Sequence, residues 1–138
     1  MTALDVYTLW QDAFRRRDLH VLADLYSENA VMESPMAGGT ILGREAILTA
    51  QDALWAAFPN MVSTFDAPLV DDDRLAFVVE FAGTHVGVMM GLAPTGRPFR
   101  FNVVFLFDLC DGQIARDRRI YDFTGLLIQL GLLKAKPA

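Results

Sequence analysis

Apolar residues recur at a helical period along the first part of the chain. Positions 4–14 place them on one face of a helix, and the pattern repeats after Asp18, a favoured N-cap residue. A third helix is expected over 44–58 and ends at Pro59, because proline cannot continue a helix. Between the second and third helices, 29–36 is expected to form a short strand. The first part of the chain is therefore predicted to be mostly helical.

The apolar period changes to two in the second part of the chain, which indicates strands. Turn residues divide this part into a meander of four antiparallel strands, at 61–70, 75–85, 98–110 and 113–122. A short apolar helix is expected over 123–133, with Gly131 as a candidate C-cap. The order of elements is thus helices first and sheet second.

This order predicts an α+β fold: a cone-shaped barrel with a strongly curved, mostly antiparallel sheet wrapped around the N-terminal helices, plus a short C-terminal helix. The whole chain, 1–138, is expected to form one domain, because its length and 53% apolar content suit a single core. The strands at 75–81 and 99–109 are apolar on both faces, and one layer of helices covers only one face. The other face is therefore expected to form a homodimer through the sheet.

Composition and charge narrow the possible function classes. A net charge of -5 argues against nucleic acid as a partner, because proteins that bind phosphate backbones concentrate Lys and Arg. No apolar run has the length of a membrane span, so no membrane partner is expected. The single cysteine, Cys110, cannot form an internal disulfide, and a cytoplasmic location is expected. His20 and His85 have no metal-ligand spacing, and neither a metal nor an organic cofactor is expected.

The end of the last strand carries the main candidate for acid–base chemistry. Side chains two positions apart share a face of a strand, so Arg118 and Asp122 lie on one side. Asp117, Arg119 and Tyr121 lie on the other side. A carboxylate in an apolar cavity has a raised pKa, which suits Asp122 to the role of a general base. Asp122 also directly precedes the last helix, where aspartate is a favoured N-cap, and the sequence leaves both roles open.

A loop rich in glycine and methionine runs from Gly83 to Gly96 and is expected to form the mouth of a pocket. His85 lies near the start of this loop and is expected either to hydrogen-bond a forming oxyanion or to be a core histidine bonded to the backbone. Arg118 would lower the pKa of Asp122 or hold an anionic group of a substrate. The residues expected to bind substrate are Trp10, Phe14, Met32, Trp55, Phe58, Met89 and Asn102.

Several motifs in the second half occur in a characteristic order: "GTHVG", "GLAPTGRPFRF", "DGQI" and "YDFTGLLIQLG". Together with "YSENAVMESP" and "GREAI", they resemble the SnoaL-like polyketide and ester cyclases of the nuclear transport factor 2-like superfamily. The resemblance covers nearly the whole chain and implies a dimeric, cone-shaped α+β barrel that closes a ring by an intramolecular aldol step without metal or cofactor. It also implies that Asp122 is the acid/base and that His85 is the histidine of the "GTH" motif. Arg116 and Arg118 stand where cyclases of this family typically carry glutamate and tryptophan.

The leading hypothesis is a cofactor-independent acid/base enzyme of the polyketide (ester) cyclase or isomerase type, acting on a hydrophobic, carbonyl-bearing small molecule. Asp122 would abstract or relay the proton, His85 would hydrogen-bond the oxyanion, and Arg118 would assist. Two alternatives stay open. One is an epoxide hydrolase of the limonene epoxide hydrolase type, which lacks a second inward-facing acid here. The other is a noncatalytic small-ligand-binding dimeric module in which Asp122 only caps the helix.

Overall fold

The computed structural model describes residues 1–135, so the expected domain end at 138 lies outside the described residues. The helices are α1 (Ala3–Arg16), α2 (Leu19–Leu25), α3 (Arg44–Ala57) and α4 (Phe123–Gln129), with a single 3-10 turn, η1 (Pro35–Ala37). Within this described part, no helix is both long enough and apolar enough to cross a membrane.

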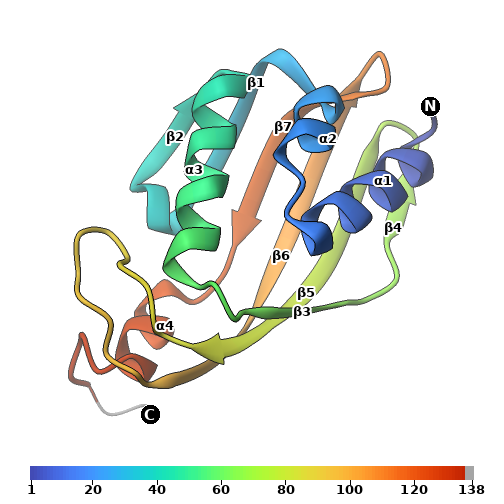
Figure 1. Ribbon diagram of the computed structural model, residues 1–138. Coiled ribbons are helices and arrows are strands. Elements are labelled where there is room, and N and C mark those ends of the chain that lie inside the picture. The colour runs from blue at the N-terminus through green and yellow to red at the C-terminus, as the bar shows by residue number, and fades with distance from the viewer. Residues whose placement is uncertain (136–138) are drawn as a thin grey trace.

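Seven strands form one curved, unclosed sheet in the order β2-β1-β7-β6-β5-β3, with β4 paired to β5. All pairings are antiparallel except that of β1 with β7. In Figure 1 the sheet bends behind α1, α2 and α3, which cover one of its faces. The predicted α+β fold class is confirmed. The strands are β1 (Tyr26–Ser34), β2 (Gly39–Leu42), β3 (Val62–Phe65), β4 (Leu69–Asp71), β5 (Arg74–Thr84), β6 (Pro98–Cys110) and β7 (Gln113–Ile120).

Local sequence signals account for most element boundaries. Asp18 caps α2 as predicted, since its carboxylate accepts a hydrogen bond of 3.1 Å from the Val21 amide. The predicted strand at 61–70 is instead two short strands, β3 and β4, that both pair with β5. The break falls around Pro68, whose nitrogen has no hydrogen to donate to a ladder.

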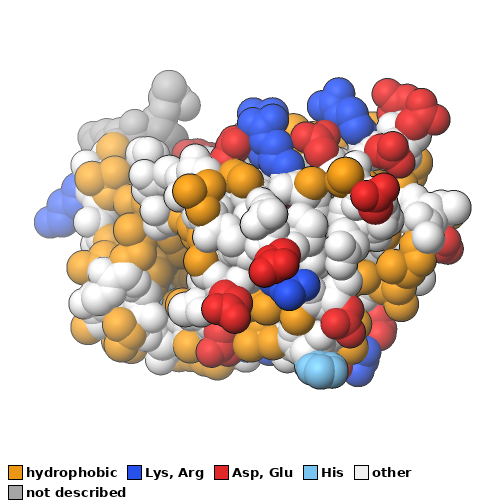
Figure 2. Space-filling model, turned by 90° about the horizontal axis from the view of Figure 1, so that it is seen from above, with side chains coloured by type: hydrophobic (Ala, Val, Ile, Leu, Met, Phe, Trp, Pro, Cys, Tyr) orange, Lys and Arg blue, Asp and Glu red, His pale blue; other side chains and the backbone are white. Residues whose placement is uncertain are grey.

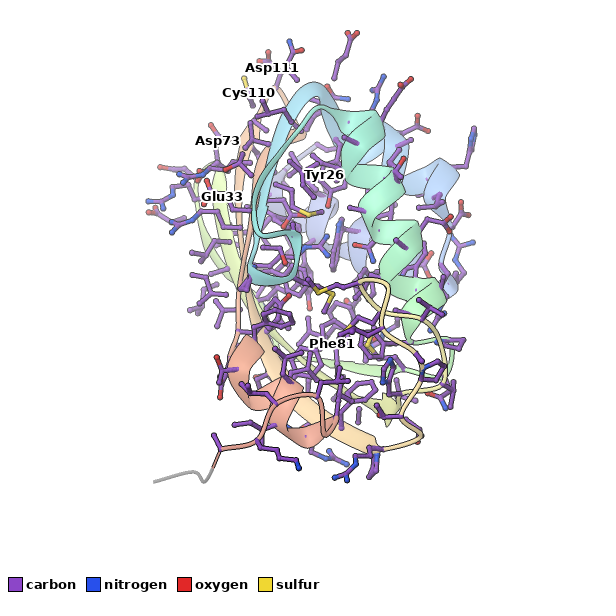
Figure 3. All side chains as sticks on the ribbon, turned by 90° about the vertical axis from the view of Figure 1, so that its left-hand side faces the viewer. Tyr26, Glu33, Asp73, Phe81, Cys110 and Asp111 are labelled. Carbon is purple, nitrogen blue, oxygen red and sulfur yellow. The ribbon has the colours of Figure 1, made fainter. Side chains whose placement is uncertain are left out.

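The core lies between the concave face of the sheet and the helices. Trp10 of α1 is completely buried at its centre and contacts the rings of Phe14, Phe77 and Phe105. Figure 3 shows the side chain of Tyr26 between the sheet and the helices. Helix α1 is thus held to the sheet mainly by packed aromatic rings.

The opposite face of the sheet carries charged side chains around a strip of apolar ones. Figure 3 shows Glu33 and Asp73 on this side, away from the helices. Glu33 accepts hydrogen bonds from Arg116 and forms an ion pair with Arg118. Acidic and basic side chains also lie next to one another on the end of the molecule seen in Figure 2. The apolar residues of the strip are only half-buried: Ala76, Val78, Val104 and Leu106.

A β-bulge in the last strand decides which of its side chains face the core. Where β7 pairs with β6, it contains one extra residue, Ala115. An extra residue shifts the alternation of faces by one position. Ile114 is buried before the bulge, and Asp117 and Arg119 are buried after it. The odd-numbered residues at the end of β7 therefore point inward.

The loop between β5 and β6 is fixed at its base and packs against the end of α3. His85 donates its amide to the Arg97 carbonyl at 2.9 Å, and the Gly96 amide donates to the His85 carbonyl at 2.9 Å. A Cβ atom at Gly87 would collide with the carbonyl oxygens of Ala56 and Ala57. Glycine is therefore required at position 87 by the close approach of two backbones.

Replacing Gly87 with alanine should push the loop away from α3. We expect Gly87→Ala to lower the free energy of unfolding by about 1–3 kcal/mol, the usual cost of overpacking. Chemical denaturation measures this loss, and limited proteolysis detects the freed loop. The neighbouring Val86→Ala is the control, because Val86 is exposed and its truncation should change stability by less than about 0.5 kcal/mol. Equal stability of the two variants would contradict the packing described above.

Candidate active site

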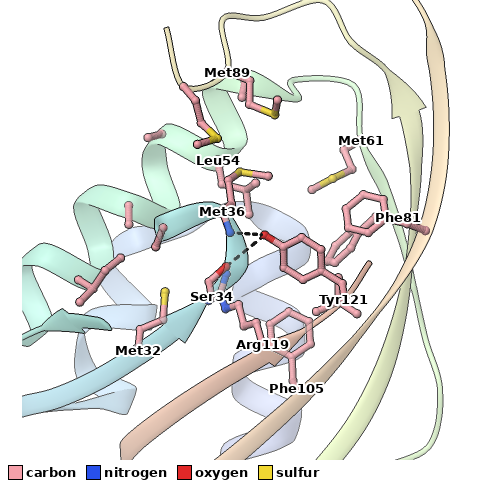
Figure 4. Close-up of a pocket in the computed structure, with 18 of the residues that line it drawn as sticks. Met32, Ser34, Met36, Leu54, Met61, Phe81, Met89, Phe105, Arg119 and Tyr121 are labelled. Carbon is pink, nitrogen blue, oxygen red and sulfur yellow. Dashed lines mark hydrogen bonds between the residues drawn. The ribbon is translucent and has the colours of Figure 1, made fainter. Parts of the chain in front are cut away.

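A cavity of about 330 Å³ opens between η1, α3, the β5–β6 loop and the concave face of the sheet. Five of the six methionines of the chain line it. Helix α3 contributes small side chains, which leave room for a guest. Flexible thioethers adapt to guests of different shape, so the cavity suits a bulky apolar molecule. Figure 4 shows most of the lining, which includes Met32, Met36, Met61, Met89, Met90, Phe81 and Phe105.

Three polar side chains, Ser34, Arg119 and Tyr121, reach this cavity within the described part of the chain. None of them is a carboxylate or an imidazole. At neutral pH this set therefore offers a cation and hydroxyl groups but no ordinary general base.

Arg119 is held by a buried carboxylate. Its Nε and Nη2 atoms donate to the two oxygens of Asp117 at 3.2 and 3.0 Å. Tyr26 donates its hydroxyl to Asp117 at 2.6 Å and accepts a hydrogen bond from Trp10 Nε1 at 3.1 Å. The guanidinium also lies over the ring of Phe105, 5.0 Å from its centre. This network joins α1, β1 and β7 at the inner end of the cavity.

The network fixes the protonation states of its members. Burial lowers the pKa of Arg119, but the charge of Asp117, together with the influence of Tyr26 and the hydrogen bonds to both, outweighs burial, and the net pKa lies above its ordinary value. Burial raises the pKa of the Tyr26 hydroxyl well above its ordinary value, and the charge of Asp117 raises it further. Arg119 is therefore a permanent cation and Tyr26 a permanent hydrogen-bond donor.

One nitrogen of Arg119 is left for a ligand. Asp117 takes Nε and Nη2, and Nη1 has no hydrogen-bond partner among residues 1–135. Nη1 is not fully buried, and the Arg119 side chain lines the cavity. This nitrogen therefore faces the space that a guest would occupy.

Tyr121 lies beside Arg119 at the same end of the cavity. Its oxygen accepts a hydrogen bond of 3.0 Å from the Met36 amide and lies 3.2 Å from Ser34 Oγ. Figure 4 shows its hydroxyl directed toward η1 from the sheet side. Burial raises the pKa of this hydroxyl, so Tyr121 stays protonated at neutral pH and can donate to an oxygen atom in the cavity.

The residues predicted to be catalytic do not meet in this cavity. Asp122 is exposed and caps α4, where its carboxylate accepts a hydrogen bond of 2.8 Å from the Gly125 amide. His85 is buried outside the lining, and its Nδ1 accepts a hydrogen bond of 3.2 Å from the Thr95 amide. Arg118 pairs with Glu33 on the opposite face of the sheet. The bulge at Ala115 accounts for the outward position of Arg118.

The predicted substrate-binding residues divide into two groups. Met32 and Met89 line the cavity, whereas Asn102 is exposed on the face of the sheet opposite the helices. The four large aromatic residues fill the core rather than the cavity: Trp10, Phe14, Trp55 and Phe58. Their helical spacing is the same for a core and for a pocket wall, so spacing alone did not separate the two.

Sequence reasoning grouped Asp117, Arg119 and Tyr121 on one face but assigned no function to them. The available signal was an acidic, a basic and an aromatic residue at alternate positions near the end of the last strand. As for metal binding, residues 1–135 hold no cluster of three His, Cys, Asp or Glu side chains suited to an ion.

A curved, unclosed sheet folded over helices, with a cavity between them, defines a nuclear transport factor 2-like α+β protein. IdmH from Streptomyces antibioticus has this fold at 30% identity and a TM-score of 0.76, with 92% of this chain and 96% of IdmH covered. TsrD from Streptomyces laurentii shares the fold at 23% identity and a TM-score of 0.80, with 94% and 95% covered.

The family follows from the sequence match. Residues 4–130 match the SnoaL-like polyketide cyclase family, and the chain belongs to that family. A curated relative, the aklanonic acid methyl ester cyclase AcmA of Streptomyces galilaeus, is 45% identical over 49 residues, or 36% of this chain and 34% of AcmA. The chain thus spans about a third of the length of the curated relatives it matches. The resemblance seen in the sequence motifs is confirmed.

The buried pair of Asp117 and Arg119 should be strongly coupled. Either Asp117→Asn or Arg119→Gln leaves a buried charge without its partner, which costs about 3–5 kcal/mol of unfolding free energy. The double variant removes both charges and should cost much less than the sum. Urea denaturation of the four proteins gives the coupling energy.

The exposed pair of Arg16 and Asp12, 2.8 Å apart, is the matched control for this cycle. It should contribute less than about 1 kcal/mol. If the double variant lost as much unfolding free energy as the two single variants together, the charges of Asp117 and Arg119 would not depend on each other.

Proposed function

We propose that this protein is a cofactor-independent acid/base enzyme of the polyketide (ester) cyclase or isomerase type. Its substrate would be a hydrophobic small molecule that carries carbonyl groups. The observation that carries the proposal is the Arg119 guanidinium, fixed by Asp117 at the inner end of an apolar cavity in a chain of the cyclase family.

In this proposal a substrate carbonyl lies against Arg119 Nη1 and the Tyr121 hydroxyl. Loss of a proton from the adjacent carbon leaves an enolate, whose negative oxygen these two donors stabilise. The enolate carbon then attacks a second carbonyl carbon of the same molecule. The new carbon–carbon bond closes the ring, and the second carbonyl oxygen takes up a proton to become a hydroxyl group. The donors are held in place beforehand, so they need not reorganise during the reaction.

The role of proton acceptor stays a prediction. Sequence reasoning gave it to Asp122, which lies at the exposed start of α4, directly after Tyr121. An acceptor there would act from outside the lining of the cavity, whereas Arg119 and Tyr121 belong to the lining. Replacing each residue separately therefore tests the two parts of the mechanism independently.

The alternatives have unequal support. An epoxide hydrolase of the limonene epoxide hydrolase type needs one carboxylate to activate water and a second acid to protonate the epoxide. The described lining of the cavity contains no carboxylate. A noncatalytic binding module needs only the apolar cavity and remains the second candidate, because Asp122 does cap α4.

Hydrogen exchange at carbon tests the proposed function directly. Apolar ketones and keto esters are incubated with the protein in heavy water, and NMR follows the loss of the hydrogens beside the carbonyl. Wild-type protein should accelerate exchange, and Arg119→Gln with Asp117→Asn should reduce the rate about 100-fold or more, as the loss of an oxyanion donor does. Asp122→Asn should lose exchange only if Asp122 is the proton acceptor.

Arg16→Gln serves as the control, because it removes an exposed arginine on α1 and should leave exchange unchanged. Binding of these compounds without exchange by wild-type protein would favour the noncatalytic module. Full activity of the doubly substituted protein would remove Arg119 from the mechanism.

We also propose a homodimer through the sheet face opposite the helices. The half-buried apolar strip on that face includes Val104 and Leu106, and Ile120 beside it is 48% exposed. Ion pairs such as Arg116 with Glu33 flank the strip. An apolar centre with a charged rim is the usual composition of a protein interface.

Sedimentation velocity tests the dimer. Leu106→Arg should shift the protein from dimer to monomer, because it places a charge in the centre of the apolar strip. Leu4→Arg is the control, since Leu4 is 54% exposed on α1, which lies against the other face of the sheet. A monomeric wild-type protein at micromolar concentration would refute the assembly.

A further inference from the structure

The cavity combines a fixed cation with the absence of a base among its described lining residues. Arg119 stays charged, Tyr121 stays protonated, and Ser34 does not ionise at physiological pH. Such a set stabilises a negative oxygen but does not itself remove a proton from carbon. The cavity is therefore better suited to bind an anion than to create one.

We propose that the cavity binds its ligand as a delocalised oxyanion, the enolate of a 1,3-dicarbonyl compound or a phenolate, with the oxygen on Arg119 Nη1. This inference rests on the proposed function in that both use the same cavity. It goes further, because it states which protonation state of the ligand is selected. Such compounds lose their proton near or moderately above neutral pH, so a single cation can shift them to the anion.

The geometry of Arg119 favours one negative oxygen at a defined point. Asp117 occupies one edge of the guanidinium, and the face lies against Phe105, so Nη1 is the free donor. The charge of Asp117 is shared with the Tyr26 hydroxyl, 2.6 Å away. This second donor reduces the extent to which Asp117 neutralises Arg119, and positive potential remains at the cavity surface.

Tyr121 provides a second donor for the same oxygen. Its oxygen already accepts the Met36 amide hydrogen, so its own proton is available to Ser34 or to a ligand. Two donors from alternate positions of one chain segment, 119 and 121, thus line the same cavity. This pair has the features of an oxyanion site, although no second cation lines the cavity within the described residues.

The rest of the cavity selects the kind of anion. Its walls are thioethers, aliphatic groups and aromatic rings, which do not replace the water around a strongly hydrated carboxylate. An enolate or phenolate spreads its charge over a conjugated, apolar framework and loses less hydration on entering. Aromatic and thioether contacts also suit a flat conjugated molecule.

Binding should therefore lower the pKa of a suitable ligand. Two probes are used: 1-phenylbutane-1,3-dione, which forms an enolate, and 1-naphthol, which forms a phenolate. Absorbance gives the ionised fraction of each probe against pH with and without saturating protein. We expect wild-type protein to lower each probe's apparent pKa by about one unit or more, which corresponds to binding the anion about tenfold tighter than the neutral form.

Matched variants identify the cause of the shift. Arg119→Gln should abolish it, and the doubly neutral Asp117→Asn, Arg119→Gln protein should do the same if the single variant fails to fold. Tyr121→Phe should reduce it, and Arg16→Gln should leave it intact. The neutral 1-methoxynaphthalene and the carboxylate 1-naphthoate should bind more weakly than 1-naphthol at a pH above the pKa of its bound form.

Each other result overturns the inference. A shift that survives the loss of Arg119, an unshifted pKa, tighter binding of 1-naphthoate, or no binding of either probe would all refute anion selection by Arg119. The proposed function fails separately. Carbon exchange with an unshifted probe pKa would leave the enzyme hypothesis standing, whereas a shifted pKa without exchange would leave an anion-binding cavity and favour the noncatalytic module.

Discussion

The buried ion pair of Asp117 and Arg119 is the interaction on which the site depends. A carboxylate without water is stable only if charged or polar donors satisfy it, and here Arg119 and Tyr26 do so. Tyr26 also accepts a hydrogen bond from Trp10. The hydrogen bonds that satisfy Asp117 therefore connect the central aromatic residue of the core to the cavity. The same contacts that satisfy Asp117 orient Arg119, so the stability of this region and its chemistry have one physical origin.

The bulge at Ala115 makes that pair possible. It turns Asp117 and Arg119 toward the core, while the arginines at even positions remain on the opposite face with Glu33. Small side chains of α3 and flexible methionines leave an apolar cavity beside the pair. An apolar wall weakens the screening of the Arg119 charge, which is why a single cation can dominate the cavity. The methionines adapt the wall to the guest without adding charge.

The sequence predicted the fold class and many local features, and it failed on the face of one strand. The capping role of Asp18 and the burial of His85, directly after β5, both follow from local patterns. Alternation correctly separated Arg118 from Arg119, but it did not reveal which set faces inward. The bulge that decides this lies at an alanine, a residue with no distinctive signal for a bulge. The motif resemblance implied Asp122, which unbroken alternation places on the same face as Arg118.

By itself, the sequence determined the α+β class, most of the order of helices and strands, and membership of the SnoaL-like polyketide cyclase family. These properties follow from periodicity, capping and motif order, which are local in the chain. The tertiary structure alone decided that Tyr26 meets Asp117 across 91 positions of sequence, and that Arg119 and Tyr121 share a cavity. Such contacts depend on strand register and on one bulge. A shift of a single residue there reverses every side chain that follows, and only the packed sheet fixes it.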